Sequence, residues 1–193
     1  YNIQHGANEH EVNTLQAMGR YIKSTNADLV GLQEVDSMCN RSGKVDQMKM
    51  LAEITGMHYA FLRHFEYDGG AYGLGILSKH PIISQQNDTI TSIKNGEKKS
   101  LALLSARVAL PKSKVVLFST VHFALDQKTR LIQADETMEF LKSEIPVILT
   151  GDFNAEPGTE ELNKLNATFK MADQQLGNTF PVINPHKKID YIW

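Results

Sequence analysis

The order of helical and strand-like segments limits what this chain can fold into. Apolar residues recur at helical spacing in residues 10–25, 45–55 and 127–143, with Asn8 as the expected cap of the first helix. Strand-like runs lie between these helices, at 58–64, 73–78, 82–90, 101–109 and 114–121. Strands alternate with helices near both ends, whereas the centre holds strands only. This pattern favours a pair of mixed sheets over a doubly wound parallel sheet.

One strand-like segment leads directly into two polar residues that suit phosphate chemistry. The apolar run Val147–Leu149 predicts a short buried strand, and Asp152 and Asn154 follow it two positions apart. In an extended backbone such residues point to the same side, so the acid and the amide can address one small target together. A base for water beside an amide that holds oxygens suits hydrolysis of a phosphate ester. The alternative is a turn in which both side chains bond to nearby backbone.

Polar residues recur where four other apolar strands stop or are interrupted. These residues are Asn2, Glu34, His122 and Asp190. A carboxylate at the end of a buried strand presents a ligand for a hard cation from a rigid support. Any single instance is explained by structure alone, but five such segments in one chain predict a shared catalytic rim.

These motifs, taken in order along the chain, resemble the endonuclease/exonuclease/phosphatase superfamily. The resemblance covers essentially the whole chain, and its most specific parts are Leu-Gln-Glu, which ends at Glu34, and Gly-Asp-Phe-Asn at 151–154. Asn2, Leu-Ser-Lys-His-Pro at 77–81, Thr-Val-His at 120–122 and Ile-Asp-Tyr-Ile at 189–192 complete it. The resemblance implies an α+β fold of the deoxyribonuclease type. This is a four-layer α/β/β/α sandwich of two mixed sheets, with the active site along one edge.

The resemblance also implies metal-dependent chemistry and assigns roles within it. Glu34 would be a ligand of Mg²⁺, with Mn²⁺ as an alternative, and Asn2 and Asp152 would be further ligands. Asp152 would also act as the general base for the attacking water. Asn2 and Asn154 would hold the water and a phosphate oxygen, while His122 would donate a hydrogen bond to a non-bridging oxygen.

Further rim residues follow from the same resemblance. Tyr72, in a glycine-rich segment that predicts a loop, matches a position whose hydroxyl touches the phosphate. Asp190 matches a catalytic acid that holds a histidine. Arg41 would either contact the substrate or brace its own loop. Arg130 and Gln133, three positions apart on one helix face, would brace the rim.

The chain departs from the family pattern in two places. Leu74 occupies a position where pancreatic-type nucleases carry an acid that orients the histidine matching His122. The chain also ends at Trp193, before the Ser-Asp-His segment with which the family continues. We therefore interpret residues 1–193 as a single domain without that segment, and favour a truncated chain over a protein that lacks part of its catalytic equipment. His64 is interpreted as structural or solvated.

Composition is that of an ordinary globular domain and narrows the function little. The chain has 193 residues, 41% of them hydrophobic, and a net charge of −2. There is no global basic field, so charge does not argue for sequence-independent nucleic-acid binding. Cys39 is the single cysteine, and no apolar run approaches the roughly 18 residues of a membrane helix. We expect a soluble monomer. The compartment stays open, because an upstream targeting segment for secretion or the periplasm could be absent from this sequence.

The sequence therefore predicts a magnesium-dependent phosphoesterase that hydrolyses a phosphodiester or phosphomonoester by in-line attack of water. Its substrate is left open between a small molecule, a lipid head group and a nucleic acid, because variable loops read that part of the substrate. One alternative is an endonuclease or exonuclease of the DNA-repair type. The other is a non-catalytic binding module that keeps the fold.

Overall fold

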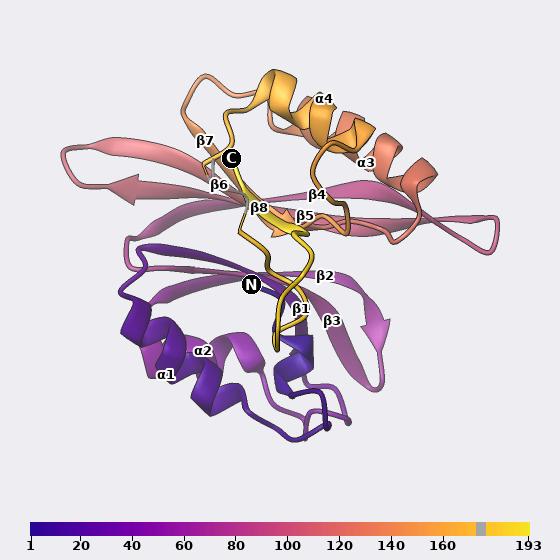
Figure 1. Cartoon of the computed structure of the whole chain (residues 1–193). Helices are drawn as coiled ribbons and strands as arrows, with labels where there is room; N and C mark the ends of the chain where they lie inside the picture. The colour runs from indigo at the N-terminus through magenta and orange to yellow at the C-terminus, as the bar shows by residue number, and fades with distance from the viewer. Residues whose placement is uncertain (173–176) are drawn as a thin grey trace.

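The chain folds into two β-sheets packed face to face, with helices on both outer faces (Figure 1). The computed structural model describes residues 1–172 and 177–193. The first sheet has the order β1-β3-β2 and the second the order β4-β5-β6-β7-β8. The strands of the two sheets are β1 (Leu29–Ser37), β2 (His58–Tyr67), β3 (Gly70–Ser78), β4 (Ile82–Lys94), β5 (Glu97–Leu110), β6 (Lys114–His122), β7 (Val147–Asp152) and β8 (Asp190–Ile192).

Both sheets are mixed. In the second sheet β6 and β7 run parallel, while the other neighbours are antiparallel. In the first sheet the three strands are antiparallel, and the chain start adds a parallel bridge between Asn2 and Gln33. The parallel β6–β7 pair places His122 beside Asp152, so two predicted site residues meet at one edge.

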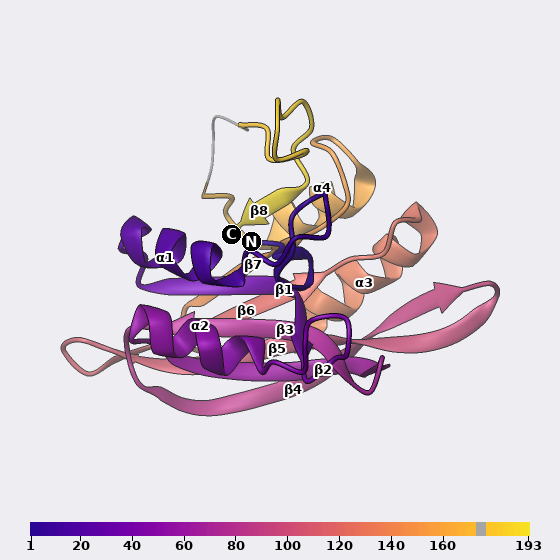
Figure 2. The ribbon, with the colours of Figure 1, turned by 90° about the horizontal axis from the view of Figure 1, so that it is seen from below.

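Two helices cover each outer face and complete the four layers (Figures 1 and 2). The helices are α1 (Leu15–Thr25) and α2 (Gln47–Thr55) on the first sheet, and α3 (Gln127–Phe140) and α4 (Glu160–Thr168) on the second, with a 3-10 turn η1 (Gln4–Gly6) near the chain start. None of the helices in the described ranges is long and apolar enough to cross a membrane. The predicted α/β/β/α sandwich is confirmed.

Three clusters of buried apolar side chains hold the layers together. One lies under α1 and α2, one lies under α3 and α4, and the third fills the space between the sheets. Leu74 and Ile76 of β3 face Leu104 and Phe118 in that third cluster, as alternation along a strand requires. Toward the site, this apolar packing gives way to a polar contact: the side chain of Gln33 donates to the Thr120 hydroxyl across the sheets at 2.7 Å.

Two helix predictions were wrong at their ends, and one helix was missed. The first helix begins at Leu15 rather than residue 10, and Asn8 does not cap it. The Asn8 side chain instead accepts from the backbone nitrogens of His10 and Val12, both at 3.0 Å, and closes a separate turn. The third helix ends at Phe140 rather than residue 143. The helix α4 was not predicted.

Candidate active site

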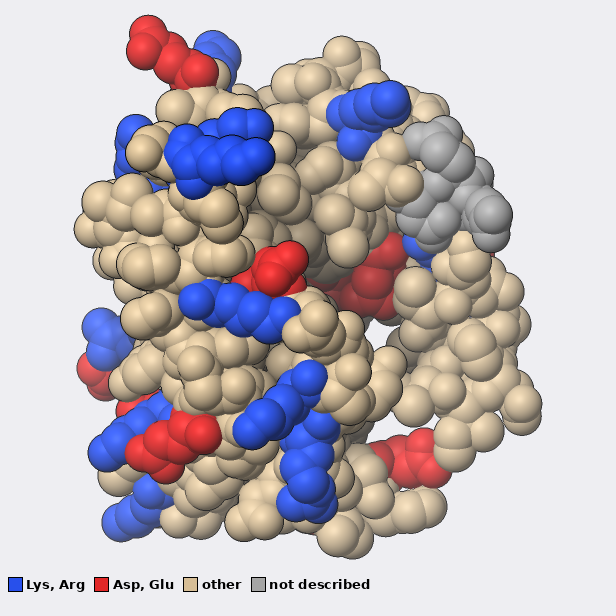
Figure 3. All heavy atoms as spheres, turned by 90° about the vertical axis from the view of Figure 1, so that its left-hand side faces the viewer, with Lys and Arg blue, Asp and Glu red and all other residues tan. Residues whose placement is uncertain are grey.

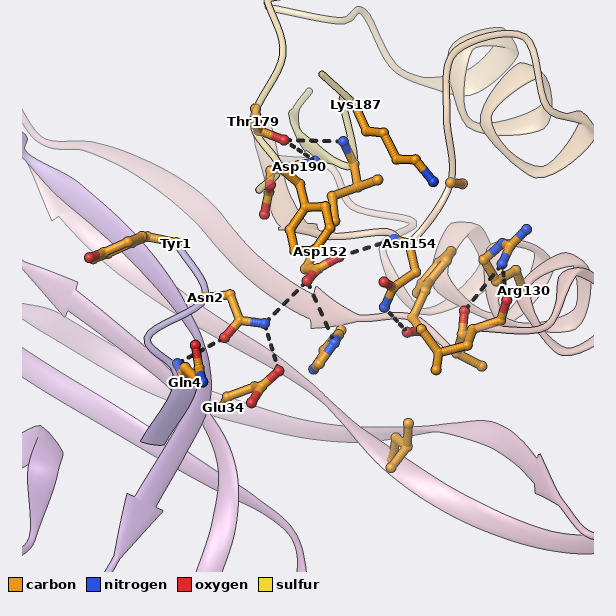
Figure 4. A pocket seen from close by; sticks show the side chains of 18 of the residues that line it. Tyr1, Asn2, Gln4, Glu34, Arg130, Asp152, Asn154, Thr179, Lys187 and Asp190 are labelled. Atoms are coloured by element: carbon orange, nitrogen blue, oxygen red, sulfur yellow. Dashed lines mark hydrogen bonds and ion pairs between the residues drawn. The ribbon is translucent and has the colours of Figure 1, made fainter. Parts of the chain in front are cut away.

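The predicted site residues gather in one cavity of about 1040 Å³, lined by residues from both sheets and from the loops beside them. Figure 4 shows the acids and amides of the two halves pointing toward one another across it. The cavity lining includes all the predicted site residues except Arg41: Asn2, Glu34, Tyr72, His122, Asp152, Asn154 and Asp190.

Two β-bulges aim polar side chains into this cavity. In β1, Leu32 pairs with Gly75 and Val35 with Gly73, so Gln33 and Glu34 stand opposite one residue of β3. Glu34 has a φ of 60°, in the left-handed region that glycine favours. It therefore lies inside β1 rather than at the strand end that the sequence suggested. A strained bulge next to a cavity is a common means of re-aiming a functional side chain.

The amide of Asn2 bridges the two halves of the site. Its nitrogen donates to a Glu34 carboxylate oxygen at 2.7 Å and to an Asp152 carboxylate oxygen at 3.2 Å. Its oxygen accepts from the backbone nitrogen of Gln4 at 3.0 Å. One amide group thus holds acids from two different sheets close together.

Asp152 and Asn154 form the turn that the sequence left as an alternative, and both residues also line the cavity. One Asp152 oxygen accepts from the Asn154 backbone nitrogen at 3.1 Å, and the other lies 3.7 Å from His122 Nε2. The Asn154 side chain donates one hydrogen bond to the Phe123 carbonyl at 2.9 Å. Asn154 has a φ of 47°, so the two side chains converge through a tight turn and not through an extended backbone.

Asp190 faces the same cavity, in agreement with its place in the family resemblance. It is the cross-strand partner of Asp152 in the antiparallel β7–β8 pair, which places both carboxylates on one face of the sheet. Burial raises the pKa of Asp190, and the nearby negative charge of Asp152 adds to this increase. Thr179 supports the segment through its hydroxyl, which accepts from the Asp190 backbone nitrogen at 3.2 Å.

Tyr72 lies in β3 and not in the predicted loop, because the glycines beside it pair with neighbouring strands. Its ring stacks on Phe65 at a centroid distance of 5.3 Å. The guanidinium carbon of Arg41 lies 5.6 Å from the centre of the Tyr72 ring. Burial raises the pKa of the Tyr72 hydroxyl, and the charge of Glu34 raises it further, so this hydroxyl stays protonated.

Arg41 is engaged outside the cavity lining. Its fork donates two hydrogen bonds of 2.8 Å to the carboxylate of Asp36, whose side chain is fully buried. Ser42 donates to the same carboxylate at 3.0 Å. These contacts match the loop-bracing alternative for Arg41, while a contact with substrate stays a prediction. Asp46, further along the same loop, caps α2 by accepting from the backbone nitrogen of Lys49.

A second bulge places His64 on the cavity wall, and its hydrogen bond with the backbone fits the structural alternative that the sequence suggested. Arg63 pairs with Gly73 and Phe65 with Tyr72, so His64 is the extra residue. Its Nδ1 accepts from the Ala102 backbone nitrogen at 2.7 Å, which assigns the ring proton to Nε2. Burial, with a smaller contribution from the charge of His122, lowers the pKa of His64 to about 3.

Arg130 and Gln133 of α3 brace the loop that follows His122, as predicted. The Arg130 guanidinium donates to Glu161 of α4 at 2.6 Å and to the Leu125 carbonyl at 2.5 Å. The Gln133 side chain accepts from the Ala124 backbone nitrogen at 2.8 Å. The Glu161 side chain is fully buried, so this loop is held by an ion pair shielded from water.

The donor set of the cavity suits a hard divalent cation. Within residues 1–172 and 177–193, neither Glu34 nor Asp152 forms an ion pair with a lysine or arginine, although both face the cavity. The same ranges hold no group of three or more His, Cys, Asp or Glu side chains arranged as metal ligands. Two carboxylates fit Mg²⁺, which takes oxygen ligands and keeps several waters. The Asn2 amide turns its nitrogen toward them, and its oxygen accepts from Gln4.

Comparison with known proteins places the chain in a family. The family model described as Endonuclease/Exonuclease/phosphatase family matches residues 1–193. The chain belongs to this family. A relative from Escherichia coli, the uncharacterized protein YbhP, is 27% identical over 188 residues. The match covers 89% of this chain and 73% of YbhP.

Solved structures of endonuclease/exonuclease/phosphatase proteins share the fold. The human Nocturnin catalytic domain is 18% identical, with a TM-score of 0.76 over 100% of this chain and 79% of that one. A Bacteroides thetaiotaomicron mannosyl-6-phosphatase is 17% identical, with a TM-score of 0.72 over 99% and 82%. A beta toxin from Staphylococcus aureus with bound magnesium ions is 18% identical, with a TM-score of 0.72 over 100% and 81%. The chain spans 61% of a family protein from Beutenbergia cavernae.

Sequence reasoning missed three parts of the cavity wall. His64 was overlooked because its orientation follows from a bulge, and a bulge shifts the alternation on which strand predictions rest. Thr179 and the hairpin that follows it gave no apolar pattern. Leu125 follows the Thr-Val-His segment closely, and that closeness to a predicted site residue was the available signal.

Proposed function

We propose that this protein is a magnesium-dependent phosphoesterase that hydrolyses a phosphodiester or phosphomonoester by in-line attack of water. The observation that carries the proposal is the pair of acids, Glu34 and Asp152, held by one amide across the two sheets. Membership of a family that includes nucleases and phosphatases supports the reaction type. A neighbour whose structure contains magnesium supports the metal, and Mn²⁺ is a chemically reasonable substitute.

Glu34 and Asp152 would hold the metal through their carboxylate oxygens. Asn2, whose amide nitrogen faces both acids in this structure, would join them once its amide turns its oxygen toward the metal. When bound, the metal would supply positive charge that stabilises the developing negative charge on the phosphate oxygens. Glu34 is the stronger candidate, because its carboxylate accepts from Asn2 and faces the cavity. Asp152 has a backbone donor on one oxygen and His122 near the other, an environment that suits orientation and deprotonation of a water.

The remaining polar groups would bind the phosphate. His122 and the free N–H of Asn154 would donate to non-bridging oxygens, because each lines the cavity next to Asp152. The Tyr72 hydroxyl would donate from the first sheet, and its raised pKa keeps the proton in place. Asp190, the cross-strand partner of Asp152, would take part in catalysis next to it. Arg41 would support substrate binding indirectly, through its contact with the Tyr72 ring.

Glu34→Gln tests the metal role directly. The substitution removes a charge at a partly exposed position, while the side chain keeps its size and its ability to form hydrogen bonds. We expect hydrolysis of p-nitrophenyl esters to fall by orders of magnitude, with a much higher Mg²⁺ concentration needed for half-maximal rate. Glu156→Gln, at another acid of the cavity lining, is the matched control. An unchanged magnesium requirement in Glu34→Gln would remove Glu34 from the metal site.

A DNA-repair-type nuclease is the second candidate. Its test is the salt dependence of duplex binding, where each phosphate contact contributes a slope near −0.9 in log K against log salt. We expect a shallow slope, because Lys and Arg are interspersed with Asp and Glu on the face in Figure 3 and the chain carries a net charge of −2. A slope of about −4 or steeper would favour the nuclease. A non-catalytic binding module would bind phosphate without turnover of any ester.

A further inference from the structure

The cavity is much larger than a phosphate group, and its polar and apolar groups are separated. The acids and amides that would handle the phosphate lie where the two sheets meet. Away from them, the wall includes three large apolar side chains that protein packing leaves uncovered. They are Leu125, which is 84% exposed, Val182, which is 88% exposed, and Phe180, which is 49% exposed.

The exposed apolar side chains come from two loops that converge on the same cavity. Leu125 lies in the loop between β6 and α3, and Phe180 and Val182 lie in the segment before β8. Figure 2 shows that segment projecting from the sandwich near the chain start. A cluster of large apolar side chains beside a polar site, drawn from separate loops, indicates a surface that a ligand covers.

Polar contacts hold the backbone of both loops in place, so the positions of their apolar side chains are fixed. The buried Arg130–Glu161 pair holds the Leu125 carbonyl, and Gln133 holds the neighbouring Ala124. In the other segment, the backbones of Phe180 and Lys187 form a bridge, with hydrogen bonds of 2.9 Å in both directions. Fixed loops lose little entropy when a ligand binds, so the exposed side chains can contribute to affinity.

The charges of the lining argue against a polyanionic ligand. Among the described lining residues, the permanent cations are Arg130 and Lys187. Arg130 pairs with Glu161, and Lys187 lies 3.7 Å from Glu156. Neither cation is left over for a second or third phosphate, whereas sequence-independent nucleic-acid binding needs several such contacts. One phosphate next to an apolar group fits this lining better than a chain of phosphates.

We propose that the substrate is a phosphate ester of an apolar alcohol, with its organic group bound by Leu125, Phe180 and Val182. This inference rests on the proposed phosphoesterase function and names the chemical class of its substrate. The phosphate lies between the two sheets, and the alkyl or aryl group extends toward the two loops. Burial of apolar surface contributes about 0.8 kcal/mol per methylene, which corresponds to roughly fourfold in affinity.

Binding of alkyl phosphonates in the presence of Mg²⁺ tests the inference without turnover. We expect butyl phosphonate to bind roughly 10- to 50-fold more tightly than methyl phosphonate in calorimetry, because it adds three methylenes. Leu125→Ser and Val182→Ser should each reduce this ratio at least about threefold, while leaving methyl phosphonate affinity unchanged. Ile83→Ser is the matched control, since Ile83 is 57% exposed on β4 and lies outside the cavity lining.

The outcomes separate this inference from the proposed function. Equal affinity for methyl and butyl phosphonate overturns the apolar subsite and leaves the phosphoesterase proposal intact. Failure of both ligands to bind with Mg²⁺ overturns both. Sedimentation with phosphatidylcholine vesicles then distinguishes two sources of the alkyl group. Vesicle binding that Val182→Ser abolishes indicates a lipid ester, and chain-length dependence without vesicle binding indicates a soluble one.

Discussion

Arg130→Met should be among the most destabilising single changes in this chain. It leaves the Glu161 carboxylate fully buried without its guanidinium partner and removes the donor to the Leu125 carbonyl. Removing one member of a buried ion pair typically costs about 3–5 kcal/mol. For a domain of this size, 1 kcal/mol shifts the melting temperature by roughly 2–4 °C, so we expect a decrease of about 6–20 °C.

Urea denaturation of the single and double variants at pH 7 checks this reasoning. Arg130→Met combined with Glu161→Leu removes both charges, so the double variant should be more stable than Arg130→Met alone. Burial raises the pKa of Glu161, but the hydrogen bond and the charge of Arg130, together with the hydrogen bond from Gln127 and a backbone hydrogen bond, outweigh burial and hold the pKa below 4.5. The pair therefore stabilises the fold above that pH and loses its effect as the pH falls. A double variant no more stable than the single one would refute the account.

Three further predictions concern residues around the site. His64 has a folded pKa of about 3, so the unfolded chain takes up a proton as the pH falls below about 6.5 while the folded chain does not. Stability should fall by about 1.4 kcal/mol per pH unit there, and urea titrations of His64→Gln should show a shallower loss. Burial raises the pKa of Cys39 to about 11, so iodoacetamide at pH 8 should label this thiol only after unfolding, and rapid native labelling would contradict its burial. Gly31→Ala would place a Cβ 2.3 Å from the Thr150 hydroxyl and 2.8 Å from that of Thr120, so thermal melts should show a loss of about 1–3 kcal/mol, with Gly177→Ala, which meets nothing within 4 Å, as control.

The apolar patterns predicted much of this fold because they record local backbone geometry. The run at 114–121 matches β6, and the helix predicted at 45–55 matches α2, which Gly56 ends in a left-handed cap. The Ile-Asp-Tyr-Ile motif also grouped Asp190 with the site residues through the family resemblance, and Asp190 lines the cavity beside Asp152. In each case the evidence lay within a few residues of the feature, so no knowledge of the partner strands was needed.

The remaining features depend on contacts between distant segments. The bulges at Glu34 and His64 exist only in relation to β3, because a register shift is a property of two strands. The bracing role of Arg41 depends on the buried Asp36 beside it, and the sequence pattern did not reveal that contact. The exposed loop that carries Val182 has no periodicity from which its position could be inferred.

The hydrogen bond from Asn2 to Asp152 joins residues 150 positions apart in the sequence and belonging to opposite halves of the sandwich. The candidate site is therefore shared between the two sheets, and each half of the sandwich carries only some of the proposed metal ligands. A small separation of the sheets on heating would part Glu34 from Asp152 while every strand stayed paired within its own sheet. Enzymatic activity would then be lost at a lower temperature than secondary structure. A bound metal that joins the two halves would raise the temperature at which activity is lost toward the temperature at which secondary structure is lost.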